Sequence, residues 1–316
     1  MSFVSALTQA ILPVLAIAGV GFLLGRVRDI DVDALSTVTI YILTPALVFS
    51  SLATSSLGGG AVVSLVIGVV AFTVLIVGVA EAVATAIGET GAVRSGLVLT
   101  SAFPNAGNYG IPLSAFAFGA VGRSTAILFI SVQAVLMYTL GVYVASRGTL
   151  ERWTSAFAAV FKLPLVYAVL AAGVARFLDV VPPATSPAME AITLTGNAAI
   201  PVMLVMLGIQ LANTDYGTTL SRVWAPVGLK VVLAPLLAIG VALLLDFANP
   251  VVGRVFVLEC AMPAAITPLM LTIEYRRDTD DLGGPAYVST AIFASTVLSV
   301  PVLAVLITLL QTGVIL

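Results

Sequence analysis

Histidine is absent from the 316-residue chain, and Cys260 is its only cysteine. These scarcities exclude disulfide frameworks, zinc motifs, histidine-based catalytic triads and c-type haem attachment. Charged residues make up only 9% of the chain, and the 13 basic residues are spread singly, without a patch for nucleic acid. We therefore expect no metal centre, no cofactor and no nucleic-acid partner.

Apolar residues are abundant, at 60% of the chain, and the mean hydropathy is +1.17. Such values indicate a polytopic membrane protein and not a soluble domain. The sequence predicts an all-α fold with ten transmembrane helices, because it contains ten apolar stretches and a membrane span needs about 20 residues. The first stretch lacks a basic region before it and a cleavage pattern, so we expect it to be retained. The predicted spans are roughly 5–25, 34–54, 60–87, 93–119, 124–146, 163–179, 188–212, 224–247, 251–275 and 285–311.

The fourth span is interrupted within TSAFPNAGNYGIPLS, residues 100–114. Proline removes a backbone donor and glycine weakens a helix interior, so two half-helices joined by a non-helical crossing are expected. Unpaired backbone groups at bilayer depth are tolerated only where protein or water satisfies them, which makes the break a candidate ligand site. The alternative is that the prolines merely bend the helix and the asparagines bond the backbone. The interrupting residues are Pro104, Asn105, Gly107, Asn108, Gly110 and Pro112.

Prolines and arginines recur in the same order in the two halves of the chain. A near-constant offset of this kind indicates an internal repeat. Five spans per copy is an odd number, so the second copy must enter the membrane with the opposite orientation. We predict two inverted repeats, residues 1–146 and 163–316, joined by a linker at 147–162. The matched pairs are Pro13 with Pro164, Pro45 with Pro201, Arg94 with Arg254 and Pro104 with Pro263, at offsets of 151, 156, 160 and 159.

Basic residues are unevenly divided between the two sides of this topology. By the positive-inside rule, the richer side faces the cytoplasm. Both termini are then outside, and the linker is cytoplasmic. The nine basic residues on the cytoplasmic side are Arg26, Arg28, Arg94, Arg147, Arg152, Lys162, Arg222, Arg276 and Arg277, against Arg123, Arg176 and Arg254 outside.

The fourth and ninth spans are each broken near the middle, so their breaks can cross at the midplane. Half-helices that begin near Asn108 and Ala265 would direct free N–H groups and positive dipole ends toward this crossing. The amides of Asn105 and Asn108 can donate to a carboxylate. The pattern therefore predicts a site for an organic anion.

The same residues carry a family resemblance. Asn105, Gly107, Gly110 and Pro112 form an N-x-G-x-x-G-x-P arrangement, and Met262-Pro263 occupies the matching span. The chain resembles the auxin efflux carrier family, which includes plant PIN exporters and prokaryotic proteins labelled malonate transporters. The resemblance implies the ten-helix fold of bile acid:sodium symporters, elevator-type alternating access and a homodimer. It also implies a scaffold domain of helices 1, 2, 6 and 7 and a transport domain of helices 3–5 and 8–10.

The resemblance further implies that Pro104 and Pro263 mark the crossing and that Asn105 contacts the substrate carboxylate. One departure is that Ala265, Ile266 and Thr267 stand where relatives often carry an asparagine. Gln133 can line the site or bond a neighbouring helix. Tyr109 can stack on an aromatic substrate or simply pack. The predicted substrate-binding residues are Pro104, Asn105, Asn108, Tyr109, Gly110, Gln133, Pro263 and Thr267.

Glu259 lies in an apolar run four residues before Pro263. A bare carboxylate there must be paired, protonated or bound to an ion, so we predict proton or sodium coupling through Glu259. The alternative is a structural ion pair or a surface position near Arg254. Glu81 and Lys230, in the equivalent third and eighth spans, are expected to pair or to extend toward the interface.

The leading prediction is a cell-membrane secondary transporter of small organic anions, carboxylates such as malonate or auxin-like acids, and not an enzyme. No GxxxxGK[ST] motif is present, so direct ATP drive is not expected. The alternatives are a sodium-coupled symporter of bile acid type and a non-transporting membrane sensor or enzyme. An intramembrane aspartyl protease would need two buried aspartates, whereas Asp179, Asp215 and Asp246 lie at span ends.

Overall fold

The computed structural model describes residues 12–30, 32–146, 161–213, 220–274 and 283–316. The regular elements of these residues are all helices, apart from one isolated bridge between Pro104 and Ala264. This agrees with the predicted all-α fold. The predicted linker lies almost wholly outside the described residues. Among the described residues, six stretches are long and apolar enough to cross a membrane: Ala34–Ala53, Gly59–Ala86, Ala106–Ser146, Pro187–Ala212, Leu220–Leu245 and Gly284–Gln311.

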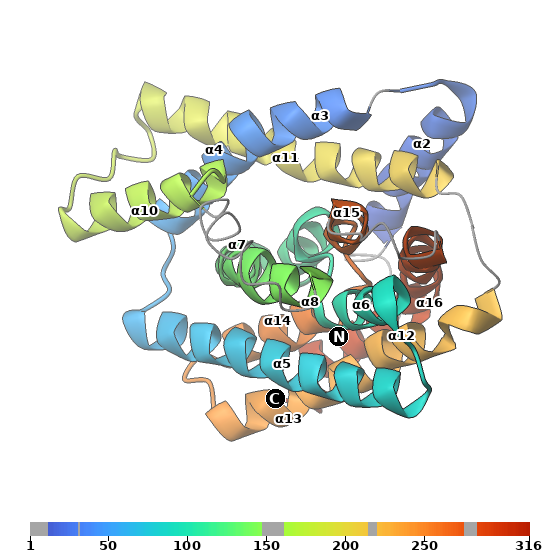
Figure 1. Cartoon of the computed structure of the whole chain (residues 1–316). Coiled ribbons are helices and arrows are strands. Elements are labelled where there is room, and N and C mark those ends of the chain that lie inside the picture. Colours follow the sequence, from blue (N-terminus) through green and yellow to red (C-terminus); the bar gives the residue numbers. More distant parts are fainter. Residues whose placement is uncertain (1–11, 31, 147–160, 214–219, 275–282) are drawn as a thin grey trace.

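One layer of helices is drawn at the top of Figure 1. Its long helix α11 approaches α2 closely, because a Cβ on Gly208 would lie 1.9 Å from the carbonyl oxygen of Ala18. Small residues let helices in a membrane pack backbone to backbone. The elements of this upper layer are α2 (Leu12–Val27), α3 (Val32–Val38), the π-helical turn η2 (Thr39–Leu43), α4 (Thr44–Ala53), α10 (Pro164–Phe177) and α11 (Pro187–Ala212).

The other elements form a thicker body, in which α5 and α13 lie farthest from the upper layer (Figure 1). Phe256 packs at its centre, with ring centroids 6.4 Å from Phe72 and 5.5 Å from Phe247. The elements of this body are α5 (Gly59–Ala86), α6 (Gly91–Ala102), η3 (Ala106–Gly110), α7 (Ile111–Leu136), η4 (Met137–Gly141), α8 (Val142–Ser146), η6 (Leu220–Val223), α12 (Trp224–Gly228), η7 (Leu229–Leu233), α13 (Ala234–Leu245), α14 (Pro250–Cys260), α15 (Thr267–Glu274) and α16 (Gly283–Gln311).

The outer faces of the helices are apolar as well. On α5, Val63, Ile67 and Val74 are exposed while Phe72 and Ile76 on the same helix are fully buried. A helix that is apolar on all sides belongs in a large core or in lipid. Since these side chains lie on the outside of the molecule, lipid is the environment that suits them.

The chain reverses direction inside α7, at Gly119. Its φ of 64° and ψ of −144° are not helical. A Cβ on Gly122 would lie 2.2 Å from the carbonyl oxygen of Ser114, eight residues earlier, which a straight helix could not allow. Farther from the turn, the Ser95 hydroxyl donates to the carbonyl oxygen of Val144 at 3.0 Å. The long segment is therefore an antiparallel hairpin with arms 106–118 and 120–146, and the predicted boundary between 119 and 124 is observed.

Gly119→Ala is expected to lower the free energy of unfolding by about 1–3 kcal/mol, because an L residue at this φ and ψ is strained. No atom lies within 4 Å of an added Cβ, so the cost comes from the backbone alone. Thermal unfolding of the purified protein in detergent measures the change. Gly78→Ala, inside α5 and equally open, is the control and should leave the midpoint unchanged or slightly raised. Equal midpoints for the two variants would contradict the turn.

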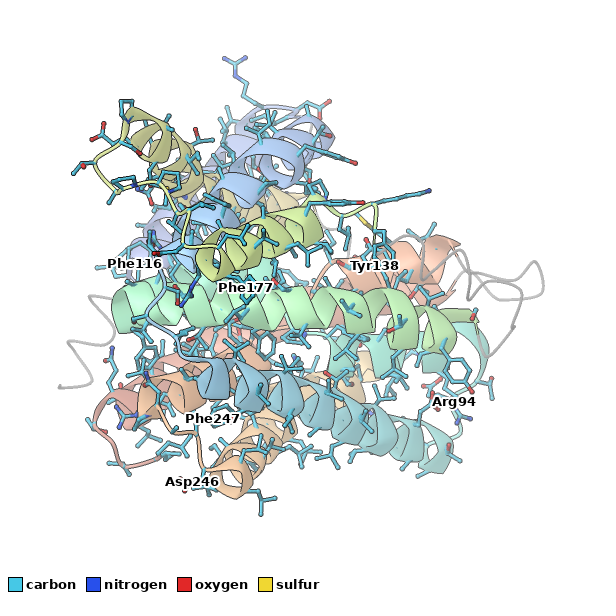
Figure 2. The ribbon with its side chains drawn as sticks, turned by 90° about the vertical axis from the view of Figure 1, so that its left-hand side faces the viewer. Arg94, Phe116, Tyr138, Phe177, Asp246 and Phe247 are labelled. Carbon is cyan, nitrogen blue, oxygen red and sulfur yellow. The ribbon has the colours of Figure 1, made fainter. Side chains whose placement is uncertain are left out.

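Two ends of the molecule are distinct in the view of Figure 2. Phe177, Asp246 and Phe247 lie toward one end of the helices, and Arg94 lies at the other. Arg94 forms an ion pair with Glu81 at 2.6 Å. The ends of α10 and α13 are thus remote from the start of α6.

Candidate functional site

Two chain breaks pair with each other at the centre of the thick body. Helix α6 ends at Ala102 and α14 ends at Cys260. Pro104 and Ala264 then form an antiparallel bridge. In it, the backbone N–H of Asn105 donates to the carbonyl oxygen of Pro263 at 2.7 Å. The Ala265 amide donates to the carbonyl oxygen of Phe103 at 3.0 Å in return. The breaks thus satisfy part of each other's backbone, as a non-helical segment at membrane depth requires.

A side chain from the following helix fixes each break. The Gln133 amide nitrogen donates to the carbonyl oxygen of Pro104 at 2.9 Å. The Ser295 hydroxyl accepts from the Ala264 amide at 3.2 Å. Of the two alternatives for Gln133, the structure therefore shows the bond to a neighbouring segment. That segment is the crossing itself. Its Oε1 is buried without a partner among the described residues.

The chain resumes a helix directly after the first break. The first bond of η3 runs from the Gly110 amide to the carbonyl oxygen of Asn105. The amides of 107–109 therefore have no acceptor within the helix. Because η3 continues into the first arm of the hairpin, this end carries the positive pole of a full helix. The half-helix begins at Ala106, two residues earlier than the sequence analysis predicted.

Two asparagine side chains lie at this helix start. Asn105 and Asn108 are both half-buried. The Asn105 side chain does not cap η3, and within the described residues neither side-chain amide has a hydrogen-bond partner. The alternative that these amides are used by the backbone is therefore not observed. Free amide donors beside a helix N-terminus suit an anion.

The second half-helix contributes less polarity. Helix α15 begins at Thr267, two residues after Ala265, near which it was predicted to begin. Thr267 is half-buried. Ala265 is buried, and Ile266 precedes Thr267. Tyr109, across the crossing on η3, is 3% exposed and belongs to the buried hydrophobic core. Of the two alternatives for Tyr109, packing is the one that this geometry favours.

Glu259 lies on the last turn of α14, against the first arm of the hairpin. Its side chain is fully buried, and Oε1 accepts a hydrogen bond from the Ser114 hydroxyl at 2.5 Å. Oε2 has no partner among the described residues. It lies so close to Gly110 that a Cβ added to this glycine would be 2.0 Å from it. Arg254 donates instead to the carbonyl oxygen of Leu316 at 2.6 Å. The alternatives of a Glu259–Arg254 ion pair and of a surface position are therefore wrong.

Lys230 makes a contact that was not predicted from the sequence. It is 1% exposed, and its ammonium group donates to the carbonyl oxygen of Cys260 at 3.1 Å. Glu81 pairs with Arg94 on another part of the body. The predicted pairing of Glu81 with Lys230, and the extension of Lys230 to the interface, are both wrong. A cation at the carbonyl end of α14 stabilises that half-helix.

Ser114 was also not predicted. It lies four residues after Gly110, on the same helix face, and both residues contact Glu259. This spacing was visible in the sequence. The partner was not, because Ser114 and Glu259 are 145 residues apart.

Two comparisons show which known proteins the chain is similar to. A family model described as "Membrane transport protein" matches residues 6–158 and again residues 153–307. An "Uncharacterized transporter" of Methanothermobacter thermautotrophicus is 29% identical over 301 residues, which cover 92% of this chain and 94% of that protein. The double match means that the two halves of the chain resemble the same model.

Proposed function

The chain belongs to this membrane transport protein family, of the auxin efflux carrier and malonate-transporter type, and on that premise we propose that it is a secondary transporter of small organic anions. The family and the relative indicate a transporter, and we propose no enzymatic activity for the chain. The observation that carries the proposal is the start of η3, where two free asparagine amides and unpaired backbone N–H groups meet beside the crossing. The substrates proposed are carboxylates such as malonate or auxin-like acids.

The proposed fold is ten transmembrane helices in two inverted repeats. The double family match supports the repeat. The two bridged residues of the crossing, Pro104 and Ala264, also lie 160 positions apart, close to the offsets of the matched sequence pairs. The hairpin at Gly119 separates the fourth helix from the fifth, and Arg94 and Asp246 lie at opposite ends, which supports the alternating direction of the proposed helices (Figure 2). The proposal that both termini lie outside rests on the distribution of the basic residues.

Transport is proposed to follow the elevator mechanism in a homodimer in the cell membrane. The upper layer, with α2, α4, α10 and α11, would be the scaffold, and the thick body that carries the crossing would move as the transport domain. Their separation in Figure 1 supports this division. The site residues would then travel together, because the crossing, Gln133 and Glu259 all belong to the body.

Transport into proteoliposomes tests the function. Labelled malonate, indole acetate and other small carboxylates are added under a proton gradient, a sodium gradient or neither. At least one of these anions should accumulate in liposomes that contain the protein, and not in empty ones. If none of them moves or binds under any gradient, the proposal fails.

Asn105→Ala is expected to weaken carboxylate binding by about 10- to 100-fold, because a hydrogen bond to a charged group contributes about 1.5–3 kcal/mol. The side chain makes no hydrogen bond with the described residues, so the thermal midpoint should not change. Isothermal titration of the transported anion measures the affinity. Asn213→Ala, at the exposed end of α11, is the control and should bind as the wild type does. Unchanged affinity in Asn105→Ala would remove this residue from the binding site.

A further inference from the structure

A small cavity of about 60 Å³ lies between the two layers, far from the crossing. It opens where α4 ends and where the second arm of the hairpin begins. Arg123 and Gln133 are ten residues apart on that arm, which is about 15 Å of helix. The lining residues are Ser51, Thr54, Ser55, Ser56, Ala120, Val121, Arg123 and Ser124.

Arg123 is the only charged residue of this lining. Its Nη1 donates to Oδ1 of Asn197 on α11 at 3.1 Å, while its Nε is buried without a partner among the described residues. No carboxylate of the described chain pairs with it. A guanidinium group that is partly removed from water and lacks a counter-charge is costly, so the cavity has an uncompensated positive charge.

One hydroxyl of the lining is buried and unpartnered among the described residues. Ser51 is 2% exposed, and its hydroxyl has no partner within the described residues. The second arm begins immediately after Gly119. Its first residues, Ala120 and Val121, line the cavity, so the free N–H groups of its first turn lie beside the cavity. The positive pole of this arm adds to the charge of Arg123.

Two carbonyl groups in the last turn of α4, and one just beyond it, already accept hydrogen bonds from side chains. The Ser124 hydroxyl donates to the carbonyl oxygen of Ser51 at 3.2 Å. Arg176 donates to the carbonyl oxygens of Leu52 at 3.1 Å and Leu57 at 3.4 Å. A cation entering the cavity would therefore meet a fixed positive charge and carbonyl groups that are already bonded, whereas an anion would meet free donors.

We propose that this cavity binds one small oxyanion from the aqueous phase, a carboxylate or a phosphate, between the upper layer and the body. Arg123 supplies the charge, and the Ser51 hydroxyl and the start of the second arm supply hydrogen bonds. The bound anion contacts α4 and the hairpin together, so it holds the two layers against each other. This site is separate from the crossing and does not depend on transport through it.

Titration of the full chain in neutral detergent with inorganic phosphate or acetate, at constant ionic strength, tests the proposal. We expect saturable binding and a rise in the thermal midpoint. Arg123→Gln should weaken the binding at least tenfold, because a charge-assisted contact is lost. Ser51→Ala should weaken it several-fold, and it provides the test by itself if Arg123→Gln does not fold. Arg28→Gln, at an exposed arginine beyond α2, is the matched control and should bind like the wild type.

Three outcomes would overturn the proposal. One is an equal response of the wild type and both cavity variants, which would mean that the anion acts elsewhere. Another is loss of the response in Asn105→Ala, which would place the anion at the crossing. The third is stabilisation only in nanodiscs that contain phosphatidic acid, with no response to soluble phosphate or acetate, which would make the occupant a lipid headgroup.

Discussion

Gly110→Ala is expected to lower the free energy of unfolding by about 1–3 kcal/mol and to abolish high-affinity carboxylate binding, since overpacking a filled site costs about this much. The added Cβ would lie 2.0 Å from Oε2 and 2.7 Å from Cδ of Glu259. The carboxylate cannot move out of the way easily, because it is fully buried and Oε1 is held by Ser114. Movement of η3 instead would displace the amides of Asn105 and Asn108. Thermal unfolding and ligand titration measure the two effects.

Two further variants separate this contact from a general intolerance of alanine. Gly240→Ala lies within α13 with no atom inside 4 Å, so it should be neutral or slightly stabilising. Glu259→Asp retracts the carboxylate, and its combination with Gly110→Ala should cost less than the two single changes summed, by at least about 0.5 kcal/mol. Additive costs would mean that residues 110 and 259 do not touch.

The breaks could be predicted from the sequence because their causes are local. Proline lacks the backbone donor that a helix needs, and the combination of Pro104 with nearby glycines predicts an interrupted helix. Pro263 occupies the matching span. Proline alone is not sufficient, because Pro201 lies inside the continuous helix α11. The boundary between the fourth and fifth spans was likewise expected between residues 119 and 124, and the turn lies at Gly119. The asparagines next to the first break stand in the same short segment, so their amide donors could be predicted to lie beside it. The family match to both halves agrees with the repeat inferred from proline spacing.

The contacts across the crossing could not be predicted, because they join residues that lie far apart in the chain. The bond from Ser114 to Glu259 spans 145 residues, and that from Lys230 to Cys260 spans 30. Spacing along one helix says which residues share a face, but not which helix that face meets. Lys230 illustrates the error that follows. Its position two turns into an apolar span suggested an interface, yet a carbonyl group at the end of another helix binds it.

Burial distinguishes Glu259 from the other acidic residues of the described chain. Glu190 lies exposed on the first turn of α11, and Glu81 is paired with Arg94. Glu259 is fully buried, and among the described residues only one of its two oxygens has a hydrogen-bond partner. A bare carboxylate in the membrane interior is energetically costly, so such a group must be protonated or bind an ion. A carboxylate that exchanges a cation beside the substrate site is what coupled transport requires.

Glu259→Gln is accordingly expected to remove the dependence of transport on the proton or sodium gradient. Glutamine has the same shape and can still accept the Ser114 hydrogen bond, so the fold should be retained, while the position can no longer carry a negative charge. Proteoliposomes with and without each gradient give the measurement: a gradient that accelerates wild-type uptake should leave the uptake of this variant unchanged. Glu190→Gln is the control and should keep the wild-type response. A Glu259→Gln protein that still responds to the gradient would show that the coupling ion binds elsewhere, and the buried carboxylate would then have a structural role through Ser114.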